Sequence, residues 1–260
     1  ANEGTIAGRD FVALKADNVK NLGGRITGSD VAVRALTDLT NLGGTIDAAN
    51  SLFVTAGRDI ESISTTSTQA NGQGTITNVS RVAGFYVTNP SGGTLLASAG
   101  RDLKLAGAQI GNASVDGQTL VAAGRDLNLT TVDTSSSQSL TWDRNNWRED
   151  SAQQEIGSSI HTAGDVRLSA GHDLNARGAS VTSDQGALVA TAGHDVNLTS
   201  SQTIRDVDEA HRHKGNSSWF SSKTISTRNT LSETTNQATT FSGNTAYVQA
   251  GNDINLKGSN

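Results

Sequence analysis

A short phrase, Ala-Gly-x-Asp followed by alternating apolar residues, recurs along the chain and constrains its fold more than any other feature. The glycines of its seven clearest copies are Gly8, Gly57, Gly100, Gly124, Gly171, Gly193 and Gly251. Copies lie 24 residues apart at Gly100 and Gly124, and the phrase Asn-Leu-Gly-Gly returns after 20 residues, at Asn21 and Asn41. A period of 20–24 residues is typical of a solenoid, whose units bury their apolar faces only by stacking on one another.

Each unit contains short apolar runs with a period of two, such as Leu120-Val121-Ala122 before the glycine and Leu127-Asn128-Leu129 after it. This alternation indicates strands of about 3–5 residues rather than helices. The single proline and the 4% of aromatic residues, beside abundant Ser, Thr and Asn, also argue against a helical protein. The leucine and asparagine consensus of a leucine-rich repeat is missing. The sequence therefore predicts an all-β fold, a parallel β-helix that spans residues 1–260 as one domain.

The repeated glycine and aspartate are predicted to be structural. Glycine permits a positive φ at a coil corner, and the aspartate two residues later can accept hydrogen bonds from amides of its own turn. The aspartates with this predicted turn-capping role are Asp10, Asp59, Asp102, Asp126, Asp173, Asp195 and Asp253. Their spacing is more than twice the nine-residue rhythm of calcium-binding coils, so no calcium ladder is expected.

Two histidine pairs are the remaining candidates for metal binding. His172 and His194 lie one coil apart, and His211 and His213 share one face of a strand. Either pair can offer two imidazoles to Zn²⁺ or Ni²⁺, but neither has a carboxylate or other third ligand at a firm spacing. The sequence therefore predicts surface histidines, no metal site and no cofactor.

Three stretches interrupt the repeat, at about residues 61–93, 130–160 and 199–246. In the second, Trp142 and Trp147 flank a turn signal at residues 143–146, and in the third a turn at residues 214–217 precedes Trp219 and Phe220. Both stretches predict β-hairpins that protrude from the coil. Their four aromatic side chains either pack against each other or the coil wall, or contact a partner surface or a membrane interface.

Several function classes are disfavoured. The net charge is −5 without a basic stripe, which argues against nucleic-acid binding, and no apolar run approaches the length of a membrane-spanning helix. The absence of cysteine excludes disulfides and thiolate metal sites. Asp and Arg recur in most coils instead of clustering once, and no catalytic motif is present, so neither an enzyme nor a small-molecule substrate is expected. A polysaccharide-acting β-helix enzyme is the remote alternative.

The phrases NLGGRI, NLGGTI, AGRDLNLT, AGHDLNARGASV, AGHDVNLT and AGNDINLKGSN together resemble the haemagglutinin-repeat region of filamentous-haemagglutinin-like exoproteins, which leave the cell by two-partner (type Vb) secretion. The resemblance covers essentially the whole chain. It implies a right-handed β-helical filament on the surface of a Gram-negative cell, with an outer-membrane transporter as its secretion partner.

Such regions occur in two kinds of protein. In contact-dependent growth inhibition effectors they serve toxin delivery to neighbouring bacteria, and the contact partner is the target cell's outer membrane or a surface receptor. In adhesins they form a stalk for attachment to host cells or biofilm. The repeat is already running at Gly8 and still running at Gly251, so we expect the chain to be a segment of a longer protein.

Overall fold

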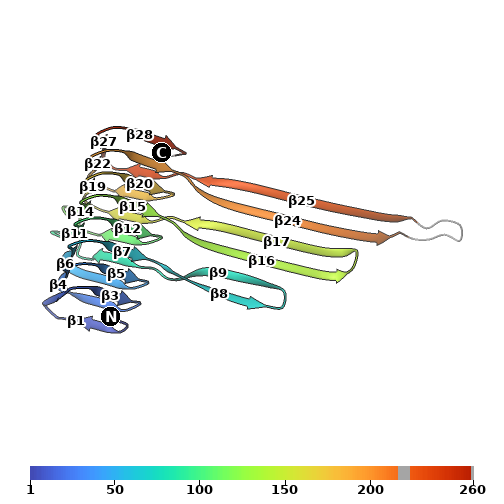
Figure 1. Ribbon diagram of the computed structural model, residues 1–260, viewed down its shortest axis with the longest axis horizontal. Coiled ribbons are helices and arrows are strands. Elements are labelled where there is room, and N and C mark those ends of the chain that lie inside the picture. Colours follow the sequence, from blue (N-terminus) through green and yellow to red (C-terminus); the bar gives the residue numbers. More distant parts are fainter. Residues whose placement is uncertain (216–222, 259–260) are drawn as a thin grey trace.

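The computed structural model describes residues 1–215 and 223–258, and these residues form strands and turns without a helix. The chain winds into a stack of coils, from which three hairpins project to one side (Figure 1). Successive coils pair through parallel strands in two sheets. The all-β fold predicted from the repeat, a parallel β-helix with protruding hairpins, is confirmed.

One wall of the coil is an eight-stranded parallel sheet. Its strands, in chain order, are β3 (Val19–Leu22), β5 (Leu39–Leu42), β7 (Ile60–Ile63), β12 (Leu103–Ala106), β15 (Leu127–Thr130), β20 (Leu174–Arg177), β23 (Val196–Thr199) and β28 (Ile254–Lys257).

The second wall is a fourteen-stranded sheet that bends around the rest of each coil. Its strands are β1 (Thr5–Ala7), β2 (Phe11–Ala16), β4 (Arg25–Ala35), β6 (Thr45–Ala56), β10 (Gly84–Val87), β11 (Thr94–Ala99), β13 (Gln109–Asn112), β14 (Gln118–Ala123), β18 (Ser159–Thr162), β19 (Asp165–Ala170), β21 (Ser180–Ser183), β22 (Ala187–Ala192), β26 (Thr240–Ser242) and β27 (Thr245–Ala250).

The core is a column of apolar side chains in register from coil to coil. Leu103 pairs with Leu127, Leu127 with Leu174 and Leu174 with Val196, and all four side chains are fully buried. The outward residues between them are only partly buried, as the period-two pattern predicts. Burying each such side chain contributes roughly 1.5–3 kcal/mol, so stacking of coils is the main source of stability.

The role predicted for the Ala-Gly-x-Asp glycines is corrected by the structure. None of the seven has a positive φ; the left-handed glycines are instead Gly23, Gly43, Gly92, Gly107, Gly178 and Gly258. A Cβ on Gly124 would lie 2.1 Å from the carbonyl oxygen of Gly100, and Gly57, Gly100, Gly171, Gly193 and Gly251 make the same close approach to the preceding coil. Gly8 approaches Phe11 of its own coil. In those six coils glycine is required because backbone stacks directly on backbone.

The prediction for the aspartates is also corrected, because their carboxylates accept amides of the next coil and not those of their own turns. The Asp59 carboxylate accepts the amide of Asp102 at 3.2 Å and a fork of hydrogen bonds from Arg101, both in the next coil. Four further carboxylates each accept the backbone amide of the equivalent aspartate in the following coil. They belong to Asp102, Asp126, Asp173 and Asp195, and the donor to Asp195 is the Asp253 amide. Asp10 contributes its backbone carbonyl, which accepts the amide of Asp30. The spacing of about 4.8 Å between coils brings the next amide within reach.

The hydrogen bonds and ion pairs that link these aspartates from coil to coil, here called the ladder, make coil stability depend on pH. The Arg101 guanidinium lowers the pKa of Asp59, and Arg58 lowers that of Asp38 in the same way. A carboxyl group whose pKa is depressed by folding stabilises the fold above its unfolded pKa of about 3.9, and this contribution disappears as the pH falls through the folded pKa.

We expect Arg101→Ala to lower the melting temperature at pH 7 and to have much less effect at an acidic pH below the folded pKa of Asp59, where this carboxyl group is protonated in both proteins. Because Arg101 is half exposed, the pH 7 effect should be modest and should shrink in high salt. Thermal denaturation followed by circular dichroism measures the melting temperature at each pH and salt concentration. An equal loss at the two pH values would contradict an electrostatic role.

Candidate interaction surface

The three hairpins join into a single six-stranded antiparallel sheet, here called the hairpin sheet. It consists of β8 (Thr65–Asn71), β9 (Gly74–Arg81), β16 (Val132–Asp143), β17 (Asn146–Ile156), β24 (Ser201–Lys214) and β25 (Thr224–Gln237), in chain order across the sheet. Figure 1 shows the hairpins side by side and lengthening from β8–β9 to β24–β25. The predicted insertions each contain one hairpin but run past it, because β10, β18 and β26 return to the coil wall.

All three hairpins leave the coil at the same corner, and they do so in every second coil. They follow β7, β15 and β23, while the alternate strands β12 and β20 lead directly into the next wall. A hairpin is two strands wide, and two strand spacings of about 4.8 Å equal the rise of two coils. The alternation therefore lets neighbouring hairpins pair edge to edge without a gap or a clash.

The chemistry of the corner differs between the two kinds of coil. Where no hairpin leaves, a left-handed glycine makes the turn, as at Gly107 and Gly178. At the hairpin bases, buried hydroxyl groups of Ser64, Ser158 and Thr239 bridge the backbone. Ser64 Oγ, for example, donates to the Gly107 carbonyl at 2.6 Å and accepts the Ala83 amide at 3.0 Å.

A charged junction fixes the second hairpin to the coil and to the third hairpin. The Glu155 carboxylate at the end of β17 accepts two hydrogen bonds from Arg177, at 3.0 and 2.7 Å, and one from the Gln202 amide at 2.7 Å. Burial alone would raise the pKa of Glu155, but Arg177 and the Gln202 amide together hold it below its usual range. The hairpin sheet is thus anchored at its base as well as paired along its length.

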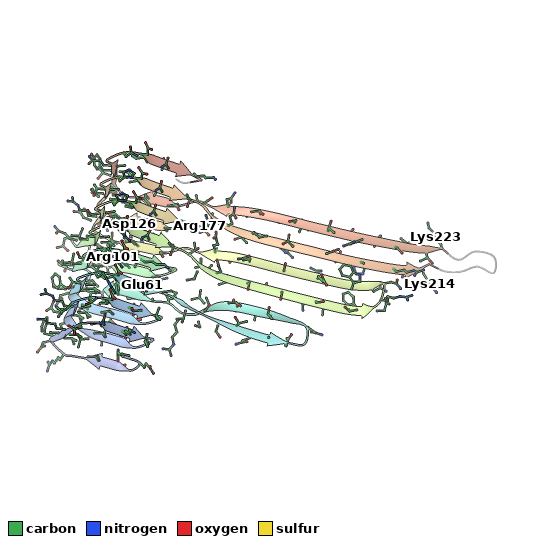
Figure 2. The ribbon with its side chains drawn as sticks, in the orientation of Figure 1. Glu61, Arg101, Asp126, Arg177, Lys214 and Lys223 are labelled. Carbon is green, nitrogen blue, oxygen red and sulfur yellow. The ribbon has the colours of Figure 1, made fainter. Side chains whose placement is uncertain are left out.

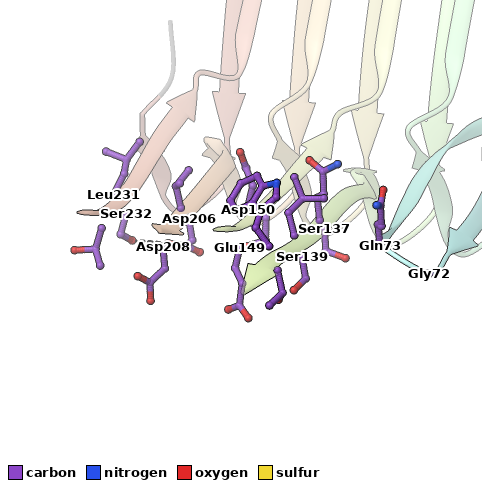
Figure 3. A pocket seen from close by; sticks show the side chains of 18 residues that line it. Gly72, Gln73, Ser137, Ser139, Glu149, Asp150, Asp206, Asp208, Leu231 and Ser232 are labelled. Carbon is purple, nitrogen blue, oxygen red and sulfur yellow. Dashed lines mark hydrogen bonds between the residues drawn. The ribbon is translucent and has the colours of Figure 1, made fainter. Parts of the chain in front are cut away.

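One face of the hairpin sheet carries hydroxyls and carboxylates in rows. Ser139, Glu149 and Asp208 pair across β16, β17 and β24, and Asp206 lies two residues along β24 from Asp208. Arg228 forms a two-pronged ion pair with Asp208 and lowers its pKa. Ser139, Glu149, Asp206 and Asp208 are among the residues that line a hollow of about 1050 Å³, which extends over all three hairpins (Figure 3).

The opposite face combines ion pairs with apolar side chains. Arg148 contacts Asp150 at 2.9 Å and Glu209 at 3.8 Å, and these residues alternate along their strands with the acidic row. Val207 and Leu231 pair beside them, and Leu231 is 46% exposed. Because the sheet is a single layer, both faces present such rows of side chains to a partner.

The outer edges of the hairpin sheet are β8 and β25, each of which pairs with one neighbour among the described residues. β25 is exposed along its whole length and is rich in Ser and Thr. Unpaired backbone groups on such an edge are a template for pairing with another strand.

Two of the four aromatic residues singled out in the sequence, Trp142 and Trp147, lie beside the turn at the outer end of the second hairpin. Trp142 is 61% exposed and its ring centroid lies 6.2 Å from that of His211 on β24. Trp147 lies under the Arg228 guanidinium, 5.7 Å from the ring centroid. Each tryptophan therefore contacts the neighbouring hairpin instead of the other tryptophan or the coil wall.

The tip of the third hairpin is only partly described. β24 continues to Lys214, and the Gly215 amide donates to the Lys223 carbonyl at 2.9 Å. The remainder of the turn predicted at residues 214–217 and the candidate residues Trp219 and Phe220 lie outside the described residues. Figure 2 labels Lys214 and Lys223 at the described ends of the two strands.

The described residues include no helix that could span a membrane.

Comparison with known proteins identifies the repeat. The family model described as "Hemagglutinin repeat" matches residues 143–260. The "tRNA nuclease CdiA" of Escherichia coli (strain STEC_O31) is 29% identical over 245 residues, which is 82% of this chain and 7% of that protein. The "Deoxyribonuclease CdiA" of Dickeya dadantii (strain 3937) is 31% identical over 175 residues, 66% of this chain and 5% of that protein. No solved structure matches.

The chain thus spans less than a tenth of the length of these relatives, and the part that it shares with them is repeat. The segment itself is structural, and its protein is a secreted, cell-surface protein of a Gram-negative bacterium. The sequence phrases, the parallel coils and both comparisons agree, and the chain is a filamentous-haemagglutinin-like repeat region.

Proposed function

We propose that this chain is a shaft segment of a contact-dependent toxin-delivery effector, exported with an outer-membrane transporter, and that the hairpin sheet is its interaction surface. The observation that carries the proposal is the hairpin sheet itself. Its strands are largely exposed and add little to the buried core, yet their exits are spaced so that they assemble into one surface. A turn of 2–6 residues would connect the same coils.

The proposed contact partner is the outer membrane or a surface receptor of the target cell. Long exposed edges such as β25 favour recognition by strand addition, in which backbone hydrogen bonds give affinity and side-chain rows give specificity. Trp142 and Trp147 flank the turn at the outer end of the second hairpin, and the exposed Trp142 side chain is accessible to a partner there.

The names of the two CdiA relatives describe nucleases. We assign no catalytic, nucleic-acid-binding or small-molecule-binding role to this segment. Several of its guanidinium groups form ion pairs with carboxylates, and those of Arg101 and Arg125 repeat from coil to coil.

The test is to replace the third hairpin, residues 200–239, in the secreted protein by the Gly-Ala corner found at residues 107–108. We expect the coil to keep its melting temperature and cell-surface display within error, because the excised strands leave the core intact. Inhibition of neighbouring cells should be lost.

The matched control replaces the shortest hairpin, residues 64–83, in the same way and leaves the β25 edge in place. This variant should retain more inhibition than the first. Unimpaired inhibition without β24–β25 would refute the proposal. If the unaltered protein does not inhibit neighbouring cells, and the variant without β24–β25 loses attachment to host cells or biofilm, the segment belongs to an adhesin stalk instead.

A further inference from the structure

The ladder of charged residues along the coil changes its chemistry part of the way up. In three coils the residue before the ladder aspartate is an arginine that donates hydrogen bonds to an aspartate of the preceding coil. The pairs are Arg58 with Asp38, Arg101 with Asp59 and Arg125 with Asp102. In the next two coils this residue is histidine, at His172 and His194. The aspartates continue without interruption, so imidazoles now stand between carboxylates.

The two imidazoles and one carboxylate converge. The rings of His172 and His194 stack with their centroids 4.7 Å apart and their planes within 6°. Asp173 Oδ1 lies 3.2 Å from His172 Nδ1 and 3.2 Å from His194 Nδ1, and the three ligand atoms all lie within 4.8 Å of one another. The third ligand that the sequence did not reveal is therefore Asp173, placed between the rings by the inter-coil register.

Further carboxylates flank this group. Asp126 Oδ1 lies 3.5 Å from His172 Nδ1, and Asp195 Oδ1 lies 3.3 Å from His194 Nδ1. Arg125 Nε also lies 3.1 Å from Asp126, so Asp173 and Asp195 are the two of these carboxylates without an arginine partner among the described residues. In the arginine coils each carboxylate is matched with a permanent cation. A bound divalent cation would supply the positive charge that arginine supplies elsewhere in the ladder.

The donor set and the spacing fit a first-row transition metal. Imidazole nitrogen and carboxylate oxygen are ordinary zinc ligands, and bonds of ~2.0–2.1 Å place neighbouring tetrahedral ligands roughly 3.3–3.4 Å apart. The observed nitrogen–oxygen separations are close to this value. Both rings are about half exposed, so they can tilt from the stacked arrangement toward a shared ion without disturbing the core.

We propose that His172, Asp173 and His194 form a surface site for a divalent transition-metal ion of the zinc class. The three side chains supply three ligands, and water completes the coordination. Because the ligands come from two successive coils, the ion joins those coils and stabilises the stack where the arginine ladder ends.

The experiment measures Zn²⁺ binding to the untagged chain by isothermal titration calorimetry, together with the melting temperature. We expect one ion per chain at this site and a higher melting temperature with Zn²⁺. His172→Asn, His194→Asn and Asp173→Asn should each weaken binding by more than the roughly 10- to 100-fold that losing a hydrogen-bond partner of a metal ligand costs. Asp173→Asn keeps an oxygen that can accept the Asp195 amide, so the coil remains paired.

The sharpest variant is His172→Arg with His194→Arg, which extends the arginine ladder that the chain already uses. It should abolish binding at this site while preserving or raising the melting temperature without metal. His161→Asn is the matched control, because His161 is also exposed and lies 3.3 Å from Asp184. His211→Asn with His213→Asn controls for the second histidine pair.

Binding that survives the double arginine variant, or that is lost in either control, would overturn the assignment. Absence of any Zn²⁺ binding by the unaltered chain would overturn it as well.

Discussion

Gly124→Ala is expected to destabilise the coil by about 3 kcal/mol, the upper part of the range for overpacked interiors. The added Cβ would lie 2.1 Å from the Gly100 carbonyl oxygen and 2.9 Å from its carbonyl carbon. Both are backbone atoms, so no side chain can move aside, and the amides of Gly100 and Arg101 on either side of this carbonyl donate to the preceding coil. The coils must separate locally, which weakens the pairing of β14 and β15 with their neighbours.

Chemical denaturation followed by circular dichroism measures this loss. Gly72→Ala is the control, because a Cβ there meets no atom within 4 Å in the tip of the first hairpin. It should change the free energy of unfolding by no more than about 0.5 kcal/mol. Equal effects of the two substitutions would show that glycine acts here through chain flexibility and not through close backbone contact.

Deleting one coil, residues 159–179, is expected to break the hairpin sheet. The deletion joins Ser158 to Ser180, which normally follows Ala179 at the equivalent corner, so the coil can close. Hairpins β16–β17 and β24–β25 would then leave from adjacent coils, about 4.8 Å apart, although each is two strands wide.

The ladder between β17 and β24 joins eight residue pairs, from Trp147↔Ala210 to Gln154↔Thr203. At about 0.2–1 kcal/mol per cross-strand pair its loss amounts to roughly 2–8 kcal/mol. Hydrogen exchange should therefore become fast at the amides of β17 and β24 and stay slow in the remaining coils.

The control makes the same deletion in a chain whose second hairpin is replaced by a Gly-Ala corner. Without that hairpin no crowding arises, and the deletion should then leave β24–β25 protected to the extent of an isolated hairpin. Intact protection of β17 and β24 after the deletion alone would show that the two-coil spacing is not what assembles the sheet.

Local patterns predicted the coil well. Alternation such as Leu127-Asn128-Leu129 fixes which side chains point inward, and the repeat aligns equivalent residues of successive coils. The residue that follows each strand of the eight-stranded wall also indicates where a hairpin leaves the coil. Coils that continue directly end in a left-handed glycine, such as Gly107 and Gly178, while Thr130 and Thr199 precede hairpins without one.

The sequence by itself thus determined the period, the strands, the inward residues and two of the three hairpins, because these depend on interactions within one unit or between identical units. The first hairpin, β8–β9, was not predicted from the stretch at residues 61–93. Only the tertiary structure decided that Gly124 stacks against Gly100, that Trp142 meets His211, and that Asp173 lies between two imidazoles. The physical reason is register: each contact joins residues about 20 to 70 positions apart, and its geometry is set by the rise of the coil and the width of a hairpin.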